Sequence, residues 1–427
     1  MAADVLIAGG EVVDEVGRRR ADVLLSEGAI KAVGERVDAP RGTQRLDASG
    51  CWVSPGLVDL HAHLRQPGME EAETVESGAR AAALGGYTAV VAMPNTDPPI
   101  DSAGVVKEVL SLAAGAACEV HPAGAITVGR QGERLAPMAE LAALGVTLFT
   151  DDGNGVQDSL LMRRALEYAT ALRVTLAQHC EDAGLAAGGH VHEGEWSSRL
   201  GLPGMPAEAE EIMVARDLAL ARLTGGRLHL LHLSTAGSVA LVRRAKAEGS
   251  PVTAEAAPHH FTLTHELVRS YDPVFKVNPP LRSPADVAAV REGLADGTLD
   301  AVATDHAPHL QEAKEAPFDE APPGMLGLET ALPLTLRELR LPPREALALL
   351  SWKPARIAGL TEHGKPILPG RPANLCVIDP RAQWVVRPDF LASRSRNTPY
   401  AGRTVTGRVR HTILRGEPVV VDGEALR

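Results

Sequence analysis

Histidine and aspartate recur in this chain where short apolar runs end, and both residue types bind divalent metal ions. The run GLVDLHAHL contains two histidines separated by one residue, His61 and His63. Because side chains alternate along a β-strand, both histidines point to the same side and can hold one ion. The other candidates lie toward the ends of separate runs: Asp151, Asp152, His179, His232 and Asp305. Histidine pairs with a carboxylate between them suit a centre with two metal ions.

Such a centre has a definite chemistry. Two divalent ions lower the pKa of a bound water and polarise a carbonyl of the substrate. A carboxylate that is not used as a bridge can carry a proton from the nucleophile to a leaving nitrogen. The residue types therefore predict cleavage of C–N bonds in amides.

The spacing leaves part of the ligand set open. In GVTLFTDDG the two carboxylates are adjacent, and strand alternation says only that either Asp151 or Asp152 points inward. His190 and His192 in GGHVHEG repeat the spacing of His61 and His63, but the flanking glycines predict a loop without a fixed face. Position at a strand end therefore favours the first histidine pair over the second.

Eight short apolar runs must position these residues, and they alternate with Ala-rich amphipathic helices. The runs are 56–64, 88–95, 119–127, 145–153, 173–182, 228–234, 251–260 and 300–309. Eight strand–helix units predict a (β/α)8 barrel over residues 56–364, with the reacting groups at the C-terminal ends of the strands. A doubly wound open sheet is the alternative, but the Gly-rich loop expected after its first strand is absent.

The two ends of the chain have a different texture. Residues 1–55 and 365–427 contain short strand-like segments punctuated by Gly and Asp, such as DVLIAGGEVVD and NLCVID. Because chain termini often lie close together, both ends are expected to form one small β-sandwich domain. The predicted fold class is α/β, a TIM-like barrel with this composite domain attached.

Composition excludes other functions. The 54 acidic and 43 basic side chains give a formal net charge of −11, which argues against binding nucleic acid. The four cysteines are far apart and form no C-x-x-C pair. No apolar stretch reaches the roughly 18 residues that suggest a membrane span. We therefore expect a soluble cytoplasmic protein that acts on a small molecule.

The motifs also resemble a known family. The barrel pattern and strand-end ligands are similar to the amidohydrolase superfamily, and the combined motif set resembles the dihydroorotases: HAHLRQPG, MPNT, FTDDG, QHCED, LHLS and ATDHAPH. The similarity extends over essentially the whole chain, and the combination is highly specific although each short piece is not. The resemblance implies a zinc-dependent hydrolase that reversibly cyclises N-carbamoyl-L-aspartate to L-dihydroorotate in de novo pyrimidine biosynthesis.

The resemblance implies roles for the metal ligands. His61 and His63 would bind one zinc ion, His179 and His232 the other, and Asp305 would bind metal and act as the catalytic proton shuttle. Many amidohydrolases bridge their metals with a carbamylated Lys, but the fourth run has none, and one branch of the dihydroorotases uses Asp there. The resemblance to that branch, in which the bridging Asp precedes the next histidine ligand by the 27 residues that separate Asp152 from His179, implies that Asp152 is the bridge, shared with a hydroxide, while Asp151 remains the alternative.

Substrate contacts follow from the same resemblance. The α-carboxylate and ring amides would be held by a set of side chains and two backbone groups: His63, Arg65, Asn95, Asn278, His309, Pro323 and Gly324. Arg65 is physically apt, because a guanidinium offers a bidentate fork to a carboxylate.

Two competing functions remain. Another cyclic amidase (a hydantoinase, dihydropyrimidinase or allantoinase) is disfavoured by Arg65 and by the missing Lys. The second is a non-catalytic, dihydroorotase-like subunit of aspartate transcarbamoylase, which would be expected to have lost metal ligands. As partners, we expect a small-molecule substrate and further copies of the chain, with association with aspartate transcarbamoylase as an open prediction.

Two further hypotheses concern residues beside the site. Asp59 lies two residues before His61 on the same strand face, so its carboxylate could orient a ligand histidine. The segment 310–323 is charged, contains several prolines and follows the last run. It could serve as a lid over the site or be an inert surface excursion.

Overall fold

The computed structural model describes residues 4–427, and its centre is a barrel of parallel strands. The strands are β8 (Leu57–Ala62), β9 (Tyr87–Ala92), β10 (Glu119–Pro122), β11 (Leu148–Phe149), β12 (Thr175–Gln178), β15 (Leu228–Leu230), β16 (Val252–Ala256) and β17 (Ala301–Val302). They form two sheets, β10-β9-β8 and β11-β12-β15-β16-β17. Parallel bridges from Ala62 to His306 and from Gly124 to Phe149 join the sheets at both edges. The barrel is therefore closed, as predicted, and each of its strands falls within one of the eight runs or begins within one residue of it.

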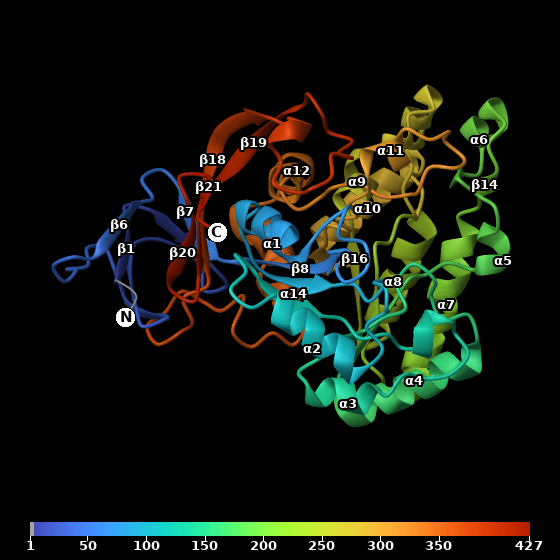
Figure 1. Cartoon of the computed structure of the whole chain (residues 1–427), viewed down its shortest axis with the longest axis horizontal. Helices are drawn as coiled ribbons and strands as arrows, with labels where there is room; N and C mark the ends of the chain where they lie inside the picture. Colours follow the sequence, from blue (N-terminus) through green and yellow to red (C-terminus); the bar gives the residue numbers. More distant parts are fainter. Residues whose placement is uncertain (1–3) are drawn as a thin grey trace.

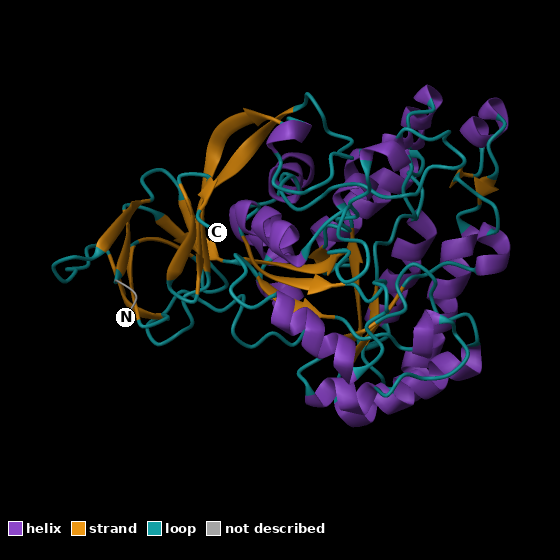
Figure 2. Cartoon of the chain, viewed as in Figure 1, coloured by secondary structure: helices purple, strands orange, loops and turns teal. Residues whose placement is uncertain are grey.

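Helices surround the strands (Figures 1 and 2). The longer ones are α1 (Val75–Leu84), α2 (Ala103–Leu112), α3 (Met138–Ala143), α4 (Ser159–Leu172), α7 (Glu208–Thr224), α8 (Ala236–Ala247), α10 (Pro284–Asp296), α12 (Ala331–Leu339), α13 (Pro343–Leu350) and α14 (Trp352–Ile357). Short polar side chains begin several of them, because an N-cap oxygen satisfies N–H groups of the first turn. Thr74, Asp158, Thr235 and Ser283 each accept such a hydrogen bond.

Apolar side chains fill the inside of the barrel. Leu60, Val91 and Leu231 belong to one buried cluster with Ala355 of α14. The hydroxyl of Thr175, at the start of β12, donates to the carbonyl of the last residue of α14 at 3.2 Å. Helix α14 therefore closes the N-terminal end of the barrel, which leaves the C-terminal ends of the strands for polar side chains.

Strands from both ends of the chain build the smaller β region, drawn in blue and red in Figure 1. They are β1 (Val5–Ala8), β2 (Glu11–Val13), β3 (Arg18–Arg20), β4 (Asp22–Ser26), β5 (Ala29–Gly34), β6 (Gln44–Asp47), β7 (Trp52–Pro55), β18 (Leu375–Val385), β19 (Thr404–Leu414), β20 (Glu417–Val421) and β21 (Glu424–Ala425). One sheet has the order β5-β4-β1-β6 and the other β21-β20-β19-β18-β7-β2-β3. Ile7, Val23, Val53 and Val377 share one buried cluster, so the two sheets enclose a core.

A single glycine separates strand β7 of this β region from β8, the first strand of the barrel. Gly56 lies between β7 and β8, and a Cβ atom there would lie 2.2 Å from the hydroxyl of Thr88. Leu375 at the start of β18 pairs with Pro55, immediately before this junction. The first barrel strand is therefore a direct continuation of a sheet made from both chain ends.

Shorter elements occupy the connections after the strands. They are α5 (Ala183–Ala186), β13 (Val191–His192), α6 (Glu195–Leu200), β14 (Gly204–Met205), α9 (Pro258–Thr262) and α11 (Gln311–Lys314), with 3-10 turns at Val128–Arg130, His265–Ser270, Pro273–Phe275 and Pro388–Phe390. The loop expected around His190 and His192 was wrong in part, because His192 lies on β13, which pairs with β14. The ring of His192 contacts Arg282 at 3.1 Å, so this pair forms no metal centre with the strand-end residues. Among residues 4–427, none of the helices has both the length and the apolar character needed to cross a membrane.

Candidate functional site

Six side chains predicted as metal ligands meet at the C-terminal end of the barrel. His61 lies in β8, and each of the others follows its strand within three residues: His63, Asp152, His179, His232 and Asp305. All six are buried. Because parallel strands end on one side of the barrel, residues far apart in sequence come together there.

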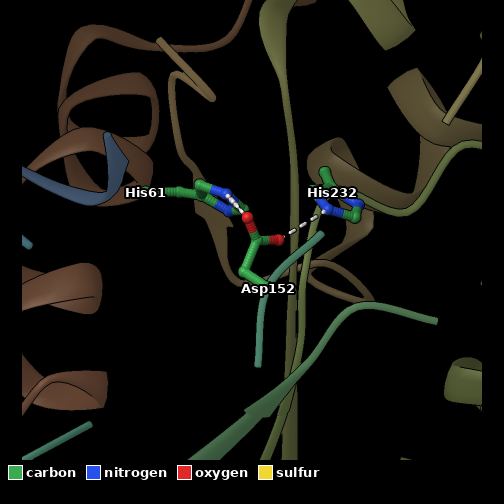
Figure 3. Close-up of side chains that lie close together, drawn as sticks. All are labelled: His61, Asp152 and His232. Atoms are coloured by element: carbon green, nitrogen blue, oxygen red, sulfur yellow. Dashed lines mark ion pairs between the residues drawn. The ribbon is translucent and has the colours of Figure 1, made fainter. Parts of the chain in front are cut away.

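The carboxylate of Asp152 lies between two pairs of histidines. Its Oδ2 atom is 3.4 Å from His61 Nε2 and 3.5 Å from His63 Nε2. Its Oδ1 atom is 3.4 Å from His232 Nε2 and 3.5 Å from His179 Nδ1. Figure 3 shows the carboxylate between His61 and His232. Each oxygen therefore faces one histidine pair, as a bridging carboxylate requires.

Asp305 completes the group on one side. Its Oδ1 atom is 3.4 Å from His63 Nε2 and 3.7 Å from His61 Nε2. The other oxygen faces His259, at 3.6 Å from Nε2. Burial alone would raise the pKa of Asp305, but His63 and the neighbouring histidines hold it well below its usual range. Asp305 is therefore an anion with one oxygen toward His61 and His63 and the other toward His259.

These donors fit two divalent ions. Ligands about 2.1 Å from one tetrahedral ion lie about 3.4 Å from each other, which matches the separations around Asp152. Two buried atoms that face this space, His61 Nε2 and Asp152 Oδ1, have no hydrogen-bond partner within residues 4–427. Burial raises the pKa of Asp152, but His61, His179 and His232 lower it well below its ordinary value. The site thus offers ionised carboxylates and imidazole nitrogens aimed at common points.

Asp151 has a different role from its neighbour. Its Oδ1 atom accepts hydrogen bonds from the backbone N–H groups of Ile126 at 2.8 Å and Thr127 at 3.0 Å, and its Oδ2 atom accepts from the Thr127 hydroxyl. Its carboxylate is therefore turned to the loop after β10, and Asp152 is the residue whose carboxylate faces the histidines. Strand alternation alone left this choice open.

A buried glutamate supports the first histidine. The Nδ1–H of His61 donates to Glu255 Oε1 at 3.1 Å, and the ring of His229 contacts Glu255 Oε2 at 2.9 Å. The pKa of Glu255 is lowered to about 2, because His229 and His61 outweigh the effect of burial. A donor bond at Nδ1 directs the lone pair of Nε2 toward Asp152. Glu255 was not among the residues predicted from the sequence, although an acidic residue within the apolar strand β16 was an available signal.

The hypothesis for Asp59 was wrong. Its carboxylate accepts hydrogen bonds from the backbone N–H of Thr304 at 2.8 Å and from its hydroxyl at 2.6 Å. The only contact with His61 is through the backbone N–H, at 3.4 Å, and not through the ring. Asp59 therefore joins the first and last strands of the barrel, and Glu255 holds the histidine ring.

Replacing Glu255 with Gln should weaken metal binding. The amide can still accept from His61, but it loses the negative charge that strengthens this histidine as a ligand. We expect the affinity for zinc to fall about 10- to 100-fold, as measured by competition with a chromogenic chelator.

The matched control is Glu73, a second fully buried glutamate paired with a histidine. Its Oε2 atom lies 3.3 Å from His306 Nε2, and His306 is not a candidate ligand. Glu73→Gln is expected to lower the melting temperature but to leave zinc affinity unchanged. Equal losses of affinity in both variants would contradict an orienting role for Glu255.

Four of the predicted substrate contacts form a group beside Asp305. Arg65 Nε donates to the carbonyl of Pro308 at 3.1 Å, and its Nη2 lies 3.3 Å from His309 Nε2. His309 Nε2 also lies 2.8 Å from the carbonyl of Pro323. A Cβ atom on Gly324 would lie 2.7 Å from His309 Nε2, so only glycine fits there. Burial lowers the pKa of Arg65 to about 10, which leaves the guanidinium charged at neutral pH.

The two predicted asparagines lie on either side of the histidines. Asn95 Oδ1 accepts from His63 Nδ1 at 2.8 Å, so Asn95 orients this ring in the way that Glu255 orients His61. Asn278 helps to lower the pKa of Glu181, whose carboxylate is 3.7 Å from His179 Nε2. The buried Asn278 Oδ1 lacks a hydrogen-bond partner in the described part of the chain. The structure thus brings all of the sequence-predicted site residues into one neighbourhood.

The segment 310–323 is packed against the protein. It begins with α11, and Lys314 Nζ donates to the carbonyls of Pro322 at 2.9 Å and Lys276 at 3.3 Å. Phe318 is buried in a cluster with Val191. The ammonium of Lys314 and the buried ring of Phe318 therefore both hold the segment against the protein.

The packing of this segment should depend on pH. Burial, followed by the charge of Lys276, lowers the pKa of Lys314 from 10.5 to about 7. Between these values the opened segment binds more protons than the packed one, so rising pH stabilises the packed form. We expect chymotrypsin cleavage after Phe318 to slow roughly 50-fold between pH 7 and pH 9, relative to a free peptide of the same sequence.

The variant Lys314→Met removes the titrating group. It should make the normalised cleavage rate nearly independent of pH. A pH dependence in this variant equal to that of the unmodified protein would show that another group controls the segment.

Solved structures with the same architecture define the class of the protein. The chain aligns with an L-hydantoinase (dihydropyrimidinase) from Arthrobacter aurescens with a TM-score of 0.89 and 25% identity, covering 100% of this chain and 98% of that one. A D-hydantoinase structure aligns with a TM-score of 0.85 and 24% identity, covering 99% and 96%. The fold is that of hydrolases of cyclic amides, which confirms the predicted fold and enzyme class.

Sequence comparison identifies the family within this class. A family model described as "Dihydro-orotase-like" matches residues 50–238. A dihydroorotase from Pelotomaculum thermopropionicum is 50% identical over 424 residues, or 98% of this chain and 99% of the relative. One from Streptomyces coelicolor is 51% identical over 426 residues, with the same shares. The chain belongs to the dihydroorotase family, and the resemblance found in its motifs is confirmed.

Proposed function

We propose that this cyclic amide hydrolase is a zinc-dependent dihydroorotase, which interconverts N-carbamoyl-L-aspartate and L-dihydroorotate in pyrimidine biosynthesis. The observation that supports this most is the position of Asp152, whose two oxygens each face one histidine pair at 3.4–3.5 Å. A buried, charged Arg65 beside this centre can donate charge-assisted hydrogen bonds to the carboxylate of dihydroorotate.

Each ligand has a place in the proposed metal centre. His61, His63 and Asp305 would hold one zinc ion, His179 and His232 the other, and Asp152 would contact both. Two zinc ions bound there supply a water of lowered pKa and polarise the carbonyl of the ring amide. Glu255 and Asn95 keep the rings of His61 and His63 turned toward the centre.

Asp305 is the proposed catalytic acid and base. In hydrolysis its carboxylate accepts the proton of the attacking water and passes it to the ring nitrogen as the C–N bond breaks. Cyclisation is the reverse, in which Asp305 takes the proton from the ureido nitrogen. His259, 3.6 Å from the Oδ2 atom, keeps the carboxylate in place, and burial lowers its own pKa to about 4 so that it stays neutral.

The remaining contacts are proposed to select the substrate. Arg65 would bind the α-carboxylate, and His63, Asn95 and Asn278 would contact its polar groups. His309 would bind the same carboxylate, since burial and the nearby Arg65 lower its pKa to about 3 and leave a neutral ring that can donate one N–H. Backbone groups of Pro323 and Gly324 would close the far side.

A substrate panel tests the proposed function. Purified protein loaded with zinc is assayed with dihydroorotate, N-carbamoyl-L-aspartate, dihydrouracil, hydantoin and allantoin. We expect turnover of the first two only, with activity lost on chelation and restored by added zinc. Turnover confined to the other three substrates would overturn the proposal in favour of a hydantoinase-like activity.

Substitution of Arg65 should reduce recognition of the carboxylate. In Arg65→Gln we expect kcat/KM for dihydroorotate to fall about 100-fold or more, mostly through KM, because charge-assisted hydrogen bonds are lost. Arg65→Lys should be intermediate, since it keeps the charge without the planar fork. Arg199, an exposed arginine paired with Glu195, is the control, and Arg199→Gln should leave KM unchanged. An unaltered KM in Arg65→Gln would contradict the assignment.

The localisation, oligomeric state and domain division of the protein are proposed as well. We propose a cytoplasmic homo-oligomer, with the chain divided at residues 56 and 364 into the catalytic barrel and the composite β domain. Size-exclusion chromatography with and without aspartate transcarbamoylase tests both self-association and the predicted partnership. Independent elution of the two enzymes would argue against the partnership.

A further inference from the structure

A second cluster of metal-binding side chains lies away from the catalytic centre. Glu119 and His121 lie two residues apart on β10, and His363 approaches them from the segment after α14. One ligand atom from each residue lies within 4.8 Å of the others. Helix α14 closes the N-terminal end of the barrel, and His363 lies in the segment that follows it. This cluster therefore lies at the start of β10, at the end of the barrel opposite the catalytic residues.

The separations in this cluster resemble those of the catalytic centre. His121 Nε2 is 3.4 Å from Glu119 Oε1, and His363 Nε2 is 3.3 Å from Glu119 Oε2. Charged N–H···O hydrogen bonds are normally about 2.7–2.9 Å long, whereas ligands of one tetrahedral ion lie about 3.4 Å apart. His363 Nε2 makes one long hydrogen bond to Glu119, and both separations also fit ligands of a shared ion.

One ring nitrogen of the cluster is unsatisfied. His121 Nε2 is buried and has no hydrogen-bond partner among the described residues. An imidazole with an unpaired nitrogen beside a carboxylate is a ready ligand for a divalent metal ion.

The second histidine is held in a fixed orientation. The side chain of His363 is 1% exposed, and its Nδ1 lies 3.0 Å from the hydroxyl of Thr88. A contact at Nδ1 directs Nε2 toward Glu119, the arrangement that is usual for metal-ligating histidines. The cluster thus has an oriented His363 as well as an available His121.

The site is open to solvent on one side. A cavity of about 460 Å³ borders it, and its lining includes Cys118, Glu119, His121 and Arg415. Arg415 Nη2 lies 2.8 Å from Glu119 Oε2, and the side chain of Arg415 is 71% exposed. A cation can therefore enter from this cavity and replace the exposed guanidinium as the partner of the carboxylate.

We propose that Glu119, His121 and His363 bind a divalent transition-metal ion such as zinc, separately from the catalytic centre. Two imidazoles and one carboxylate are a common donor set for zinc, and solvent supplies the remaining position. The ion would link β10 to the segment after α14. This proposal does not depend on the proposed substrate or reaction.

Metal counting with matched histidine variants tests the proposal. Wild type, His121→Gln and the control His190→Gln are equilibrated with the same micromolar excess of free zinc, and bound zinc is measured by mass spectrometry. We expect His121→Gln to hold about one equivalent less than wild type and His190→Gln to match wild type. The same zinc content in all three proteins would overturn the proposal.

Diffraction from the wild-type protein locates the ion independently of any variant. Crystals grown with zinc are measured on both sides of the zinc absorption edge. We expect an anomalous peak between Glu119, His121 and His363, in addition to any peaks at the catalytic centre. Saturating zinc with no peak at this position would refute the proposal, and the cluster would then be a network of ring and carboxylate contacts only.

Discussion

Replacement of Asp152 with Asn is expected to remove at least one equivalent of bound zinc and to lower kcat for dihydroorotate hydrolysis by more than about 100-fold. Residues that only orient a metal ligand typically contribute 10- to 100-fold, and Asp152 faces all four histidines directly. An amide has one acceptor oxygen and no charge, so it cannot serve both histidine pairs. Zinc content and steady-state rates are measured on the same preparation.

The adjacent carboxylate provides the control. Asp151 accepts two backbone N–H bonds from Ile126 and Thr127, so Asp151→Asn should destabilise this loop by about 1–3 kcal/mol. Its zinc content should equal that of wild type. If Asp151→Asn loses zinc while Asp152→Asn retains it, the bridge has been assigned to the wrong residue.

Asp305→Asn should give the second large effect. The amide cannot accept the proton of the attacking water, and general acid–base catalysis by one group contributes about 10²- to 10⁴-fold. We expect kcat to fall by this factor in both directions of the reaction, while dihydroorotate still binds through Arg65. Rates are compared with ligand affinity measured by calorimetry.

Asp300, five residues earlier, is a suitable control for Asp305. It lies just before β17, at the opposite end of the strand, and its carboxylate binds Lys246 Nζ at 2.6 Å. Asp300→Asn should change stability, because the carboxylate also accepts the backbone N–H of Ala254, and should leave kcat within about twofold of wild type, because it lies at the opposite end of the strand from the site. Loss of binding in Asp305→Asn, with kcat unchanged at saturation, would contradict a role in proton transfer.

The meeting of the candidate metal ligands could be predicted because strand ends carry strong local signals. His61 and His63 share one face by simple alternation, and His179, His232 and Asp305 each follow a buried strand. In a barrel of parallel strands these positions meet whatever the details of the loops. Arg65 could be placed for the same reason, since it follows His63 by two residues.

Side-chain direction and long-range contacts could not be read from the sequence. The choice between Asp151 and Asp152 depends on how the chain turns after β11, which no local pattern encodes. Glu255 contacts His61 across 194 positions of sequence. Asp59 was predicted to orient a ligand histidine because it is near His61 in sequence. Its carboxylate instead accepts a hydrogen bond from Thr304, which follows the last barrel strand.

Spacing alone also failed to separate metal-binding pairs from others. His190 and His192 have the spacing of His61 and His63, but the ring of His192 contacts the guanidinium of Arg282. Glu119 and His121 were not predicted as metal ligands, because their third partner, His363, lies on a segment far away in the sequence. A pair of ligands becomes a site only when the fold supplies the rest of the donor set.

The junction at Gly56 bears on how the chain folds during synthesis. The strand that carries His61 starts directly after β7, and β7 pairs with β18, which begins at Leu375. A nascent chain therefore completes all the barrel strands before the sheet that anchors the first of them can form. Truncation before β18 should leave β7, and β8 that follows it, without the neighbouring strand β18. We therefore expect an active enzyme to need the C-terminal strands, even though they supply none of the candidate ligands.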